Sequence, residues 1–250
     1  MSNSSKVCEA ISLVRQMACG KEKIDPFFVC KLFGIVVIDT YKLDKEGYFV
    51  CKNGYKLIFV SSNIINQHRK KFIVAHELGH YLMHGNQLYG CANIGLVQNQ
   101  QINTPIQEKE ANEFASELLL PTDLLKKQLP LKQLSFDVIT EIANSYDVSV
   151  TMTAIKSIQN SKSEDEILLC YEEGILKWFA STNKNIKLAQ VPARCPMDLD
   201  GNSNYGNVTM FWDDIFVGSV KQEVFRTYGE QYLVLLSGNE WNELDGDWWY

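Results

Sequence analysis

Residues 73–85 read Ile-Val-Ala-His-Glu-Leu-Gly-His-Tyr-Leu-Met-His-Gly, and the run from His76 to His80 has the form His-Glu-x-x-His. On an α-helix these two histidines lie about 40° apart around the axis and about 6 Å along it, so both imidazoles can reach one Zn²⁺ ion. Glu77 is rotated away from both, to the place where a general base for an attacking water belongs. The run therefore predicts a helix that carries a metal-dependent hydrolytic site.

The same helix shows a separate apolar face, which predicts that it packs in a core. Its apolar side chains fall within about 180° of arc: Ile73, Val74, Leu78, Tyr81 and Leu82. Gly79 lacks a side chain where another backbone can approach closely. His84 is about 12 Å along the axis from His76, too far to share its tetrahedral ion. We expect His84 either behind the ligands or as a complement to the charge of the helix C-terminus.

A catalytic zinc needs a third protein ligand, and residues 104–121 are the best place to find it. Thr104 is a plausible cap, Pro105 suits the first helical position, and Pro121 marks the end, so this segment is predicted to be a helix. Its predicted buried stripe consists of Ala111, Phe114, Ala115, Leu118 and Leu119.

Four glutamates in this helix compete for the role of third ligand. Three are expected on the solvated side, namely Glu110, Glu113 and Glu117. Glu108 lies at the edge of the buried stripe, where a carboxylate is costly unless it is paired or bound to metal. We therefore predict Glu108 as the third ligand. Asn112, one turn later, is expected to hydrogen-bond a ligating imidazole. Cys91 is interpreted as a small buried residue rather than a ligand.

These two blocks resemble the ImmA/IrrE family of zinc metallopeptidases over roughly residues 7–160. The resemblance rests on Phe72-Ile73-Val74-Ala75-His76-Glu77-Leu78-Gly79-His80 and on Glu108-x-x-Ala111-Asn112-x-Phe114-Ala115-x-x-Leu118-Leu119-x-Pro121. It implies a gluzincin-like site, with His76, His80 and Glu108 on zinc and Glu77 as base. It also implies action inside the cell, commonly on helix-turn-helix repressors of mobile elements or stress genes.

The expected fold class is α+β. A zincin-like metallopeptidase domain is predicted over 1–160, with strands at 34–39 and 55–61 and a helix-turn-helix-like segment at 136–158. The polar stretch 159–166 is the best linker candidate. A smaller β-rich domain is expected over 165–250, as a sensor or recognition domain by analogy with the family. Its predicted strands are 167–171, 175–180, 207–212, 215–220 and 232–236.

Two features of this scheme each have two interpretations. The edge of the strand at 55–60 could hold an extended substrate by backbone pairing, or the strand could be an ordinary member of its sheet. The second helix of the 136–158 segment carries only Lys156 as a basic residue before Lys162. That is too little for phosphate contacts, so packing is favoured over reading of DNA.

Composition agrees with an intracellular protein. The net charge of −6 and the pI of about 5.3 disfavour tight, nonspecific binding of nucleic acid. The sequence shows neither a charged leader before a long apolar run nor a run of eighteen apolar residues. We therefore expect neither secretion nor a membrane span. The seven cysteines are scattered without a C-x-x-C pair, which is typical of free thiols in a reducing cytoplasm.

Two functions remain open at this point. The first is a zinc-dependent endopeptidase that inactivates a regulatory protein, and the second is a non-proteolytic, metal-stabilised module that sequesters such a protein. A binding module would need His76, His80 and Glu108 but not the base, so Glu77 favours catalysis. Neither the substrate nor the oligomeric state follows from the sequence.

Overall fold

A computed structural model describes residues 5–84, 105–130, 133–196, 212–227 and 231–238, and the backbone of residues 240–241. The chain forms two compact units. The first contains Met1–Thr122 and Tyr146–Val148, and the second contains Asp123–Ser145 and Ser149–Tyr250. A compact unit is not the same as a folding domain, so the domain boundary that the sequence places between 160 and 165 stays a prediction.

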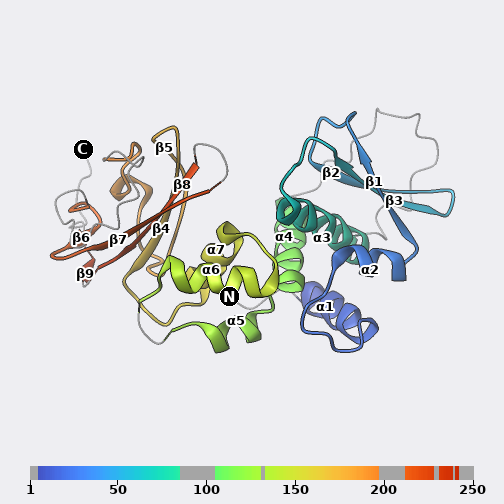
Figure 1. Cartoon of the computed structure of the whole chain (residues 1–250), viewed down its shortest axis with the longest axis horizontal. Coiled ribbons are helices and arrows are strands. Elements are labelled where there is room, and N and C mark those ends of the chain that lie inside the picture. The colour runs from blue at the N-terminus through green and yellow to red at the C-terminus, as the bar shows by residue number, and fades with distance from the viewer. Residues whose placement is uncertain are drawn as a thin grey trace. The chain divides into compact units, whose positions relative to one another are not determined.

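The first unit combines helices with one small sheet (Figure 1). Its elements are α1 (Ser5–Met17), α2 (Pro26–Leu32), β1 (Ile35–Thr40), β2 (Gly47–Lys52), β3 (Tyr55–Ser61), α3 (Gln67–His84) and α4 (Pro105–Leu119). Strand β3 pairs parallel with β1 and antiparallel with β2. Helix α3 packs against β2, β3 and α4. The α+β class is confirmed, and so are the predicted helices that carry the His-Glu-x-x-His run and Glu108.

Strand β2 was absent from the sequence prediction, although its turn carries a clear signal. Lys52 pairs with Tyr55, so the hairpin closes through the two residues Asn53 and Gly54. Both have positive φ, 51° and 80°, as a two-residue turn with the hand of the strand twist requires. An Asn-Gly pair between two apolar runs is a strong hairpin signal.

The sheet order β1-β3-β2 rules out one predicted role for β3. The sequence left open whether the segment 55–60 offers a free edge to a substrate. It does not, because β3 is the middle strand and its backbone groups are paired on both sides. Among the strands that the structure describes in this sheet, β2 lies at one edge, beside α3.

Helix α4 confirms the predicted apolar stripe but corrects the assignment of its glutamates. Glu117, predicted to be solvated, is buried, pairs with Arg15 of α1 and accepts hydrogen bonds from Thr122. Glu110 is also largely covered, with its side chain 12% exposed. The cause is that α4 packs against both α1 and α3, so it has two covered sides rather than one. The predicted cap Thr104 lies outside the described residues.

The space left by the missing side chain of Gly79 is occupied by the ring of Phe114 from α4, whereas the sequence suggested the close approach of another backbone. A Cβ atom at Gly79 would lie 2.9 Å from Cδ1 of Phe114, whose side chain is fully buried. Real Cβ atoms do not make such contacts, so any larger residue must displace a ring in the core.

We expect Gly79→Ala to destabilise the protein by about 1–3 kcal/mol, because overpacking outweighs the roughly 1 kcal/mol that alanine contributes to helix propensity. Urea denaturation measures the change. Phe114→Leu in the same chain should recover part of the loss, since the smaller side chain leaves room for the methyl group. A fully additive double variant would contradict this explanation.

In the part of the second unit that the structure describes there are three α-helices, a four-stranded antiparallel sheet and the strand pair β6-β9. Its elements are α5 (Thr122–Gln128), α6 (Phe136–Tyr146), α7 (Val150–Asn160), β4 (Glu166–Glu172), β5 (Ile175–Ser181), the short 3-10 helix η2 (Leu188–Gln190), β6 (Phe216–Val217), β7 (Lys221–Arg226), β8 (Gln231–Ser237) and β9 (Glu240–Trp241). The sheet order is β5-β4-β8-β7. Its core gathers Trp212, Phe216 and alternate buried residues of β4 and β8, which lie on one face of the sheet.

Three of the strands predicted here are confirmed, and one is misplaced. The predicted strand 215–220 is only the two-residue β6, and the long strand β7 follows it instead. Most of the predicted strand 207–212 lies outside the described residues. The predicted linker 159–166 begins inside α7 and ends at Glu166, whose buried carboxylate accepts hydrogen bonds from the backbone of Leu134 and from Ser161.

Helices α6 and α7 confirm the helix, turn and helix predicted for 136–158. Asp147 in the turn has a φ of 54°, and the Ser149 side chain caps α7 by accepting from the Met152 N–H. Lys156 is buried, so its ammonium is not presented for phosphate contacts. Likeness to a helix-turn-helix unit stays a prediction.

Two further observations concern the described residues only. No helix among them is long and apolar enough to cross a membrane. Six of the seven cysteines are described, and each of the six is a free thiol; Cys91 lies outside the described residues.

Candidate metal centre

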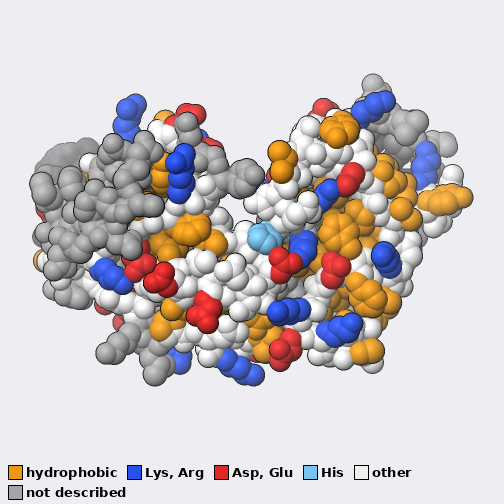
Figure 2. Space-filling model, in the orientation of Figure 1, with side chains coloured by type: hydrophobic (Ala, Val, Ile, Leu, Met, Phe, Trp, Pro, Cys, Tyr) orange, Lys and Arg blue, Asp and Glu red, His pale blue; other side chains and the backbone are white. Residues whose placement is uncertain are grey.

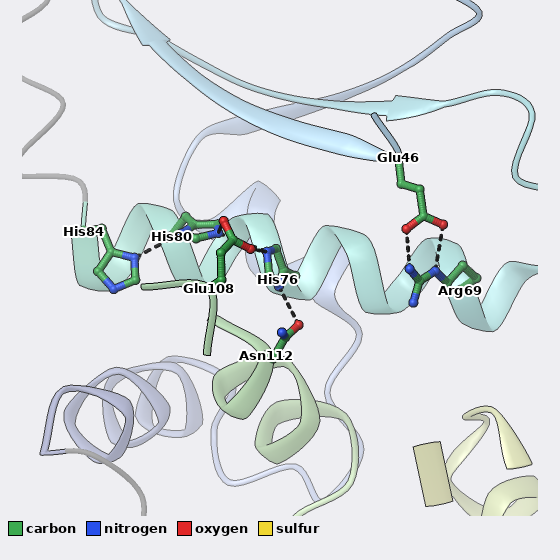
Figure 3. Close-up of polar contacts among 7 residues, drawn as sticks. All are labelled: Glu46, Arg69, His76, His80, His84, Glu108 and Asn112. Carbon is green, nitrogen blue, oxygen red and sulfur yellow. Dashed lines mark hydrogen bonds and ion pairs between the residues drawn. The ribbon is translucent and has the colours of Figure 1, made fainter. Parts of the chain in front are cut away.

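Helices α3 and α4 bring three predicted ligands together (Figure 3). His76 and His80 project from successive turns of α3, and Glu108 reaches them from the first turn of α4. The two imidazole Nε2 atoms are 3.0 Å apart. The Glu108 carboxylate places Oε2 3.1 Å from Nε2 of His76 and Oε1 3.4 Å from Nε2 of His80.

This donor set fits a tetrahedral zinc ion. Zinc bonds of about 2.0–2.1 Å put the ligand atoms of a tetrahedron about 3.3 Å apart, close to the three separations here. One possible ligand atom from each of the three residues lies within 4.8 Å of the others. Two imidazoles and one carboxylate are the usual protein ligands of a catalytic zinc, which keeps a fourth position open. The described residues thus fit the metal that the sequence predicts.

The imidazoles are set up as neutral ligands. Burial lowers the pKa of His76, and burial together with the neighbouring His76 lowers the pKa of His80 to about 4. Near pH 7 both rings are therefore unprotonated and have a lone pair to donate. The Nδ1 of His76 lies 3.0 Å from Oδ1 of Asn112, as expected for a residue that orients the ring.

Glu77 is buried beside the ligands and has an unusual affinity for a proton. Burial, with the Glu108 carboxylate as a second cause, raises its pKa to about 7. A hydrogen bond from the backbone N–H of Phe49 and the positive charge of Lys45 act in the opposite direction. A carboxylate with a pKa near 7 is suited both to accept and to return a proton at neutral pH.

Strand β2 supplies a wall of the site that the sequence did not reveal. A Cβ at Gly47 would lie 2.4 Å from Cγ2 of Ile73 and 3.6 Å from Cγ of Glu77. The strand thus begins directly over α3, and Phe49 two residues later donates its N–H to Glu77. The Asn53-Gly54 turn signal could have located the strand, but nothing local to it indicates that it covers Glu77.

The basic cluster at the start of α3 is neutralised by acidic partners. Arg69 forms a two-pronged ion pair with Glu46, at the entry to β2 (Figure 3). Lys70 pairs with Asp39, and Lys71 pairs with Asp147 of the same unit. On the face that Figure 2 shows, Lys and Arg side chains of this unit lie among acidic and apolar ones rather than in one basic patch.

Comparison with known proteins gives a family match and two curated relatives. The model of a peptidase family, described as the IrrE N-terminal-like domain, matches residues 30–157. An uncharacterized immunity region protein 2 of Bacillus phage phi105 is 30% identical over 128 residues, which are 51% of this chain and 70% of that protein. The metallopeptidase ImmA of Bacillus subtilis (strain 168) is 36% identical over 78 residues, which are 31% of this chain and 41% of that protein.

Solved structures are also similar, and one of them matches over most of the chain. A Mycobacterium tuberculosis transcriptional regulator superposes with a TM-score of 0.55 and 13% sequence identity, over 93% of this chain and 76% of that chain. At this identity the likeness concerns the fold alone.

Proposed function

Since the chain belongs to the ImmA/IrrE family, we propose that it is a zinc-dependent endopeptidase that cleaves a regulatory protein. In this proposal His76, His80 and Glu108 bind the zinc ion, and Glu77 is the general base. Asn112 orients His76. Membership of a peptidase family implies a protein substrate.

One observation carries the proposal. Three possible ligand atoms converge at tetrahedral spacing, and the buried carboxylate of Glu77 directly follows His76 on the same helix. A metal site that only stabilises a fold has four protein ligands and no need of a base. Three candidate ligands among the described residues, together with a neighbouring carboxylate that can act as a base, support a hydrolytic site.

The residues would act in a fixed order. Zinc, when bound, polarises the scissile carbonyl and makes the attacking water more acidic. Glu77 takes the proton from that water and then delivers it to the leaving amine. The Phe49 N–H keeps the Glu77 carboxylate oriented while it is charged.

We propose that the substrate binds as an extended segment beside β2. Of the two strands that flank β3, β2 packs against α3 along its length and reaches Glu77 through Phe49. Strand β1, by contrast, meets α3 through the ion pair of Asp39 with Lys70. Pairing of an extended peptide with an edge strand would hold its backbone by hydrogen bonds that are independent of sequence. This replaces the role that the sequence offered for β3.

The proposed partner is a helix-turn-helix repressor of a mobile element or a stress response. Two relatives support this, since one is named an immunity region protein of a phage and the other a metallopeptidase ImmA. We propose that the chain acts in the cytoplasm and does not bind nucleic acid directly, because the basic residues of α3 are paired. Residues 165–250 are proposed as a sensor or recognition domain.

The test is to mix the full chain with the helix-turn-helix repressor encoded beside its gene, with zinc or with a chelator. A single cut that requires zinc is the expected result, read by mass spectrometry of the fragments. If the repressor binds the chain but stays intact, the chain is a sequestering module. If it neither binds nor is cut, the proposed partner is wrong.

A further inference from the structure

His84 and Glu110 form a buried polar pair directly behind the candidate metal centre (Figure 3 shows His84 beside His80). The Nδ1 of His84 lies 3.0 Å from Nδ1 of His80, and its Nε2 lies 3.0 Å from Oε2 of Glu110. The side chains of His84 and Glu110 are only 5% and 12% exposed. A carboxylate so well covered is costly to bury without such a partner.

The direction of each hydrogen bond follows from the need for a lone pair on His80. To bind metal through Nε2, a neutral His80 must carry its proton on Nδ1. That proton then points at Nδ1 of His84, which must accept it. His84 therefore carries its own proton on Nε2 and donates it to the carboxylate of Glu110.

We infer that Glu110 and His84 are positioning residues that hold His80 in its metal-binding tautomer and orientation. This inference rests on the proposed zinc site. The two histidine ligands are thus supported differently: His76 by the single amide of Asn112, and His80 by an imidazole backed by a carboxylate. Hydrogen bonds polarise one another along a chain, so the Glu110 charge makes His80 a stronger donor to the metal.

Variants of Glu110 test the inference against a matched control. Glu110→Gln keeps an acceptor oxygen but removes the charge, and Glu110→Ala removes both. Glu113→Gln is the control, because Glu113 lies on the same helix, is 29% exposed and pairs with Lys109 at 4.0 Å. Zinc affinity is measured by competition with a chromophoric chelator, and the melting temperature of each metal-free variant reports any purely structural effect.

We expect zinc affinity to fall by roughly 10–100-fold in Glu110→Ala, with a smaller loss in Glu110→Gln and none in Glu113→Gln. In the zinc-loaded wild type, nitrogen-detected NMR should show His84 as the tautomer protonated on Nε2. A His84 ring protonated on Nδ1 would overturn the inference even if the variants failed to fold.

The outcomes separate this inference from the proposed function. If the wild type binds zinc but Glu110→Gln and Glu110→Ala bind it as tightly as Glu113→Gln, the positioning role is wrong and the metal site stands. If the wild type binds no zinc, the site and the positioning role both fall. Cleavage of a substrate is not needed for either readout.

Discussion

Glu77→Gln should lower the rate of peptide cleavage by about 10²–10⁴-fold, the usual contribution of a general base, while the protein still binds zinc. Glutamine has nearly the same shape and can still accept the Phe49 N–H, but it cannot take a proton. Burial penalises the charged carboxylate at this position, so the neutral amide should not destabilise the fold. Cleavage kinetics, metal content and the melting temperature are the three measurements.

The pH dependence of the same variant provides an independent check. In the metal-free protein the raised pKa of Glu77 means that the folded state binds its proton more tightly than the unfolded state does. The wild type therefore gains stability from protonation of Glu77 as the pH falls from above 7 toward 4.5, the ordinary pKa of a glutamate. Glutamine does not titrate, so the variant lacks this gain. The free energy of unfolding of metal-free Glu77→Gln minus that of the metal-free wild type should therefore be larger at pH 8 than at pH 5.

A bound zinc ion would add positive charge close to the Glu77 carboxylate. Its positive charge opposes both the cost of burial and the repulsion from Glu108, so zinc should bring the pKa of Glu77 below 7. Activity of the wild type should then decline on the acid side of neutrality. Glu113→Gln, the matched control, should cleave like the wild type. Undiminished cleavage by Glu77→Gln would refute the assigned mechanism.

The sequence predicted those parts of the site that depend on one helix at a time. The spacing of His76 and His80 and the edge position of Glu108 on its own helix follow from 3.6 residues per turn. For each of these, the geometry of a single element was enough.

What the sequence missed depends on which elements become neighbours. Glu117 looked solvated because a helical wheel cannot show that Arg15, 102 residues earlier, covers that side of α4. Glu110 looked solvated for the same reason, since its partner His84 belongs to another helix. The order of strands in a sheet likewise cannot be read from the sequence of one strand. The sequence therefore left open a free edge for β3, although β3 lies between β1 and β2.

Removal of the third ligand gives the second large effect, and Glu108 is the best residue for it. Its side chain is 44% exposed, so Glu108→Ala leaves no buried cavity. His80, with a side chain only 6% exposed, would leave one and confuse loss of metal with loss of fold. We expect metal-free Glu108→Ala to melt close to the wild type.

Zinc affinity of Glu108→Ala should fall by more than the roughly 10–100-fold that the loss of an outer hydrogen-bonding partner costs, because a bond to the metal itself is removed. Three alanine variants of one helix then form a series. Glu108→Ala should lose most affinity, Glu110→Ala less, and Glu113→Ala none, whereas the sequence alone treats the last two alike. Chelator competition measures all three. Equal zinc affinities for Glu108→Ala and Glu113→Ala would show that Glu108 is not a ligand. Because both variants should fold like the wild type, a change in folding could not mask a loss of affinity.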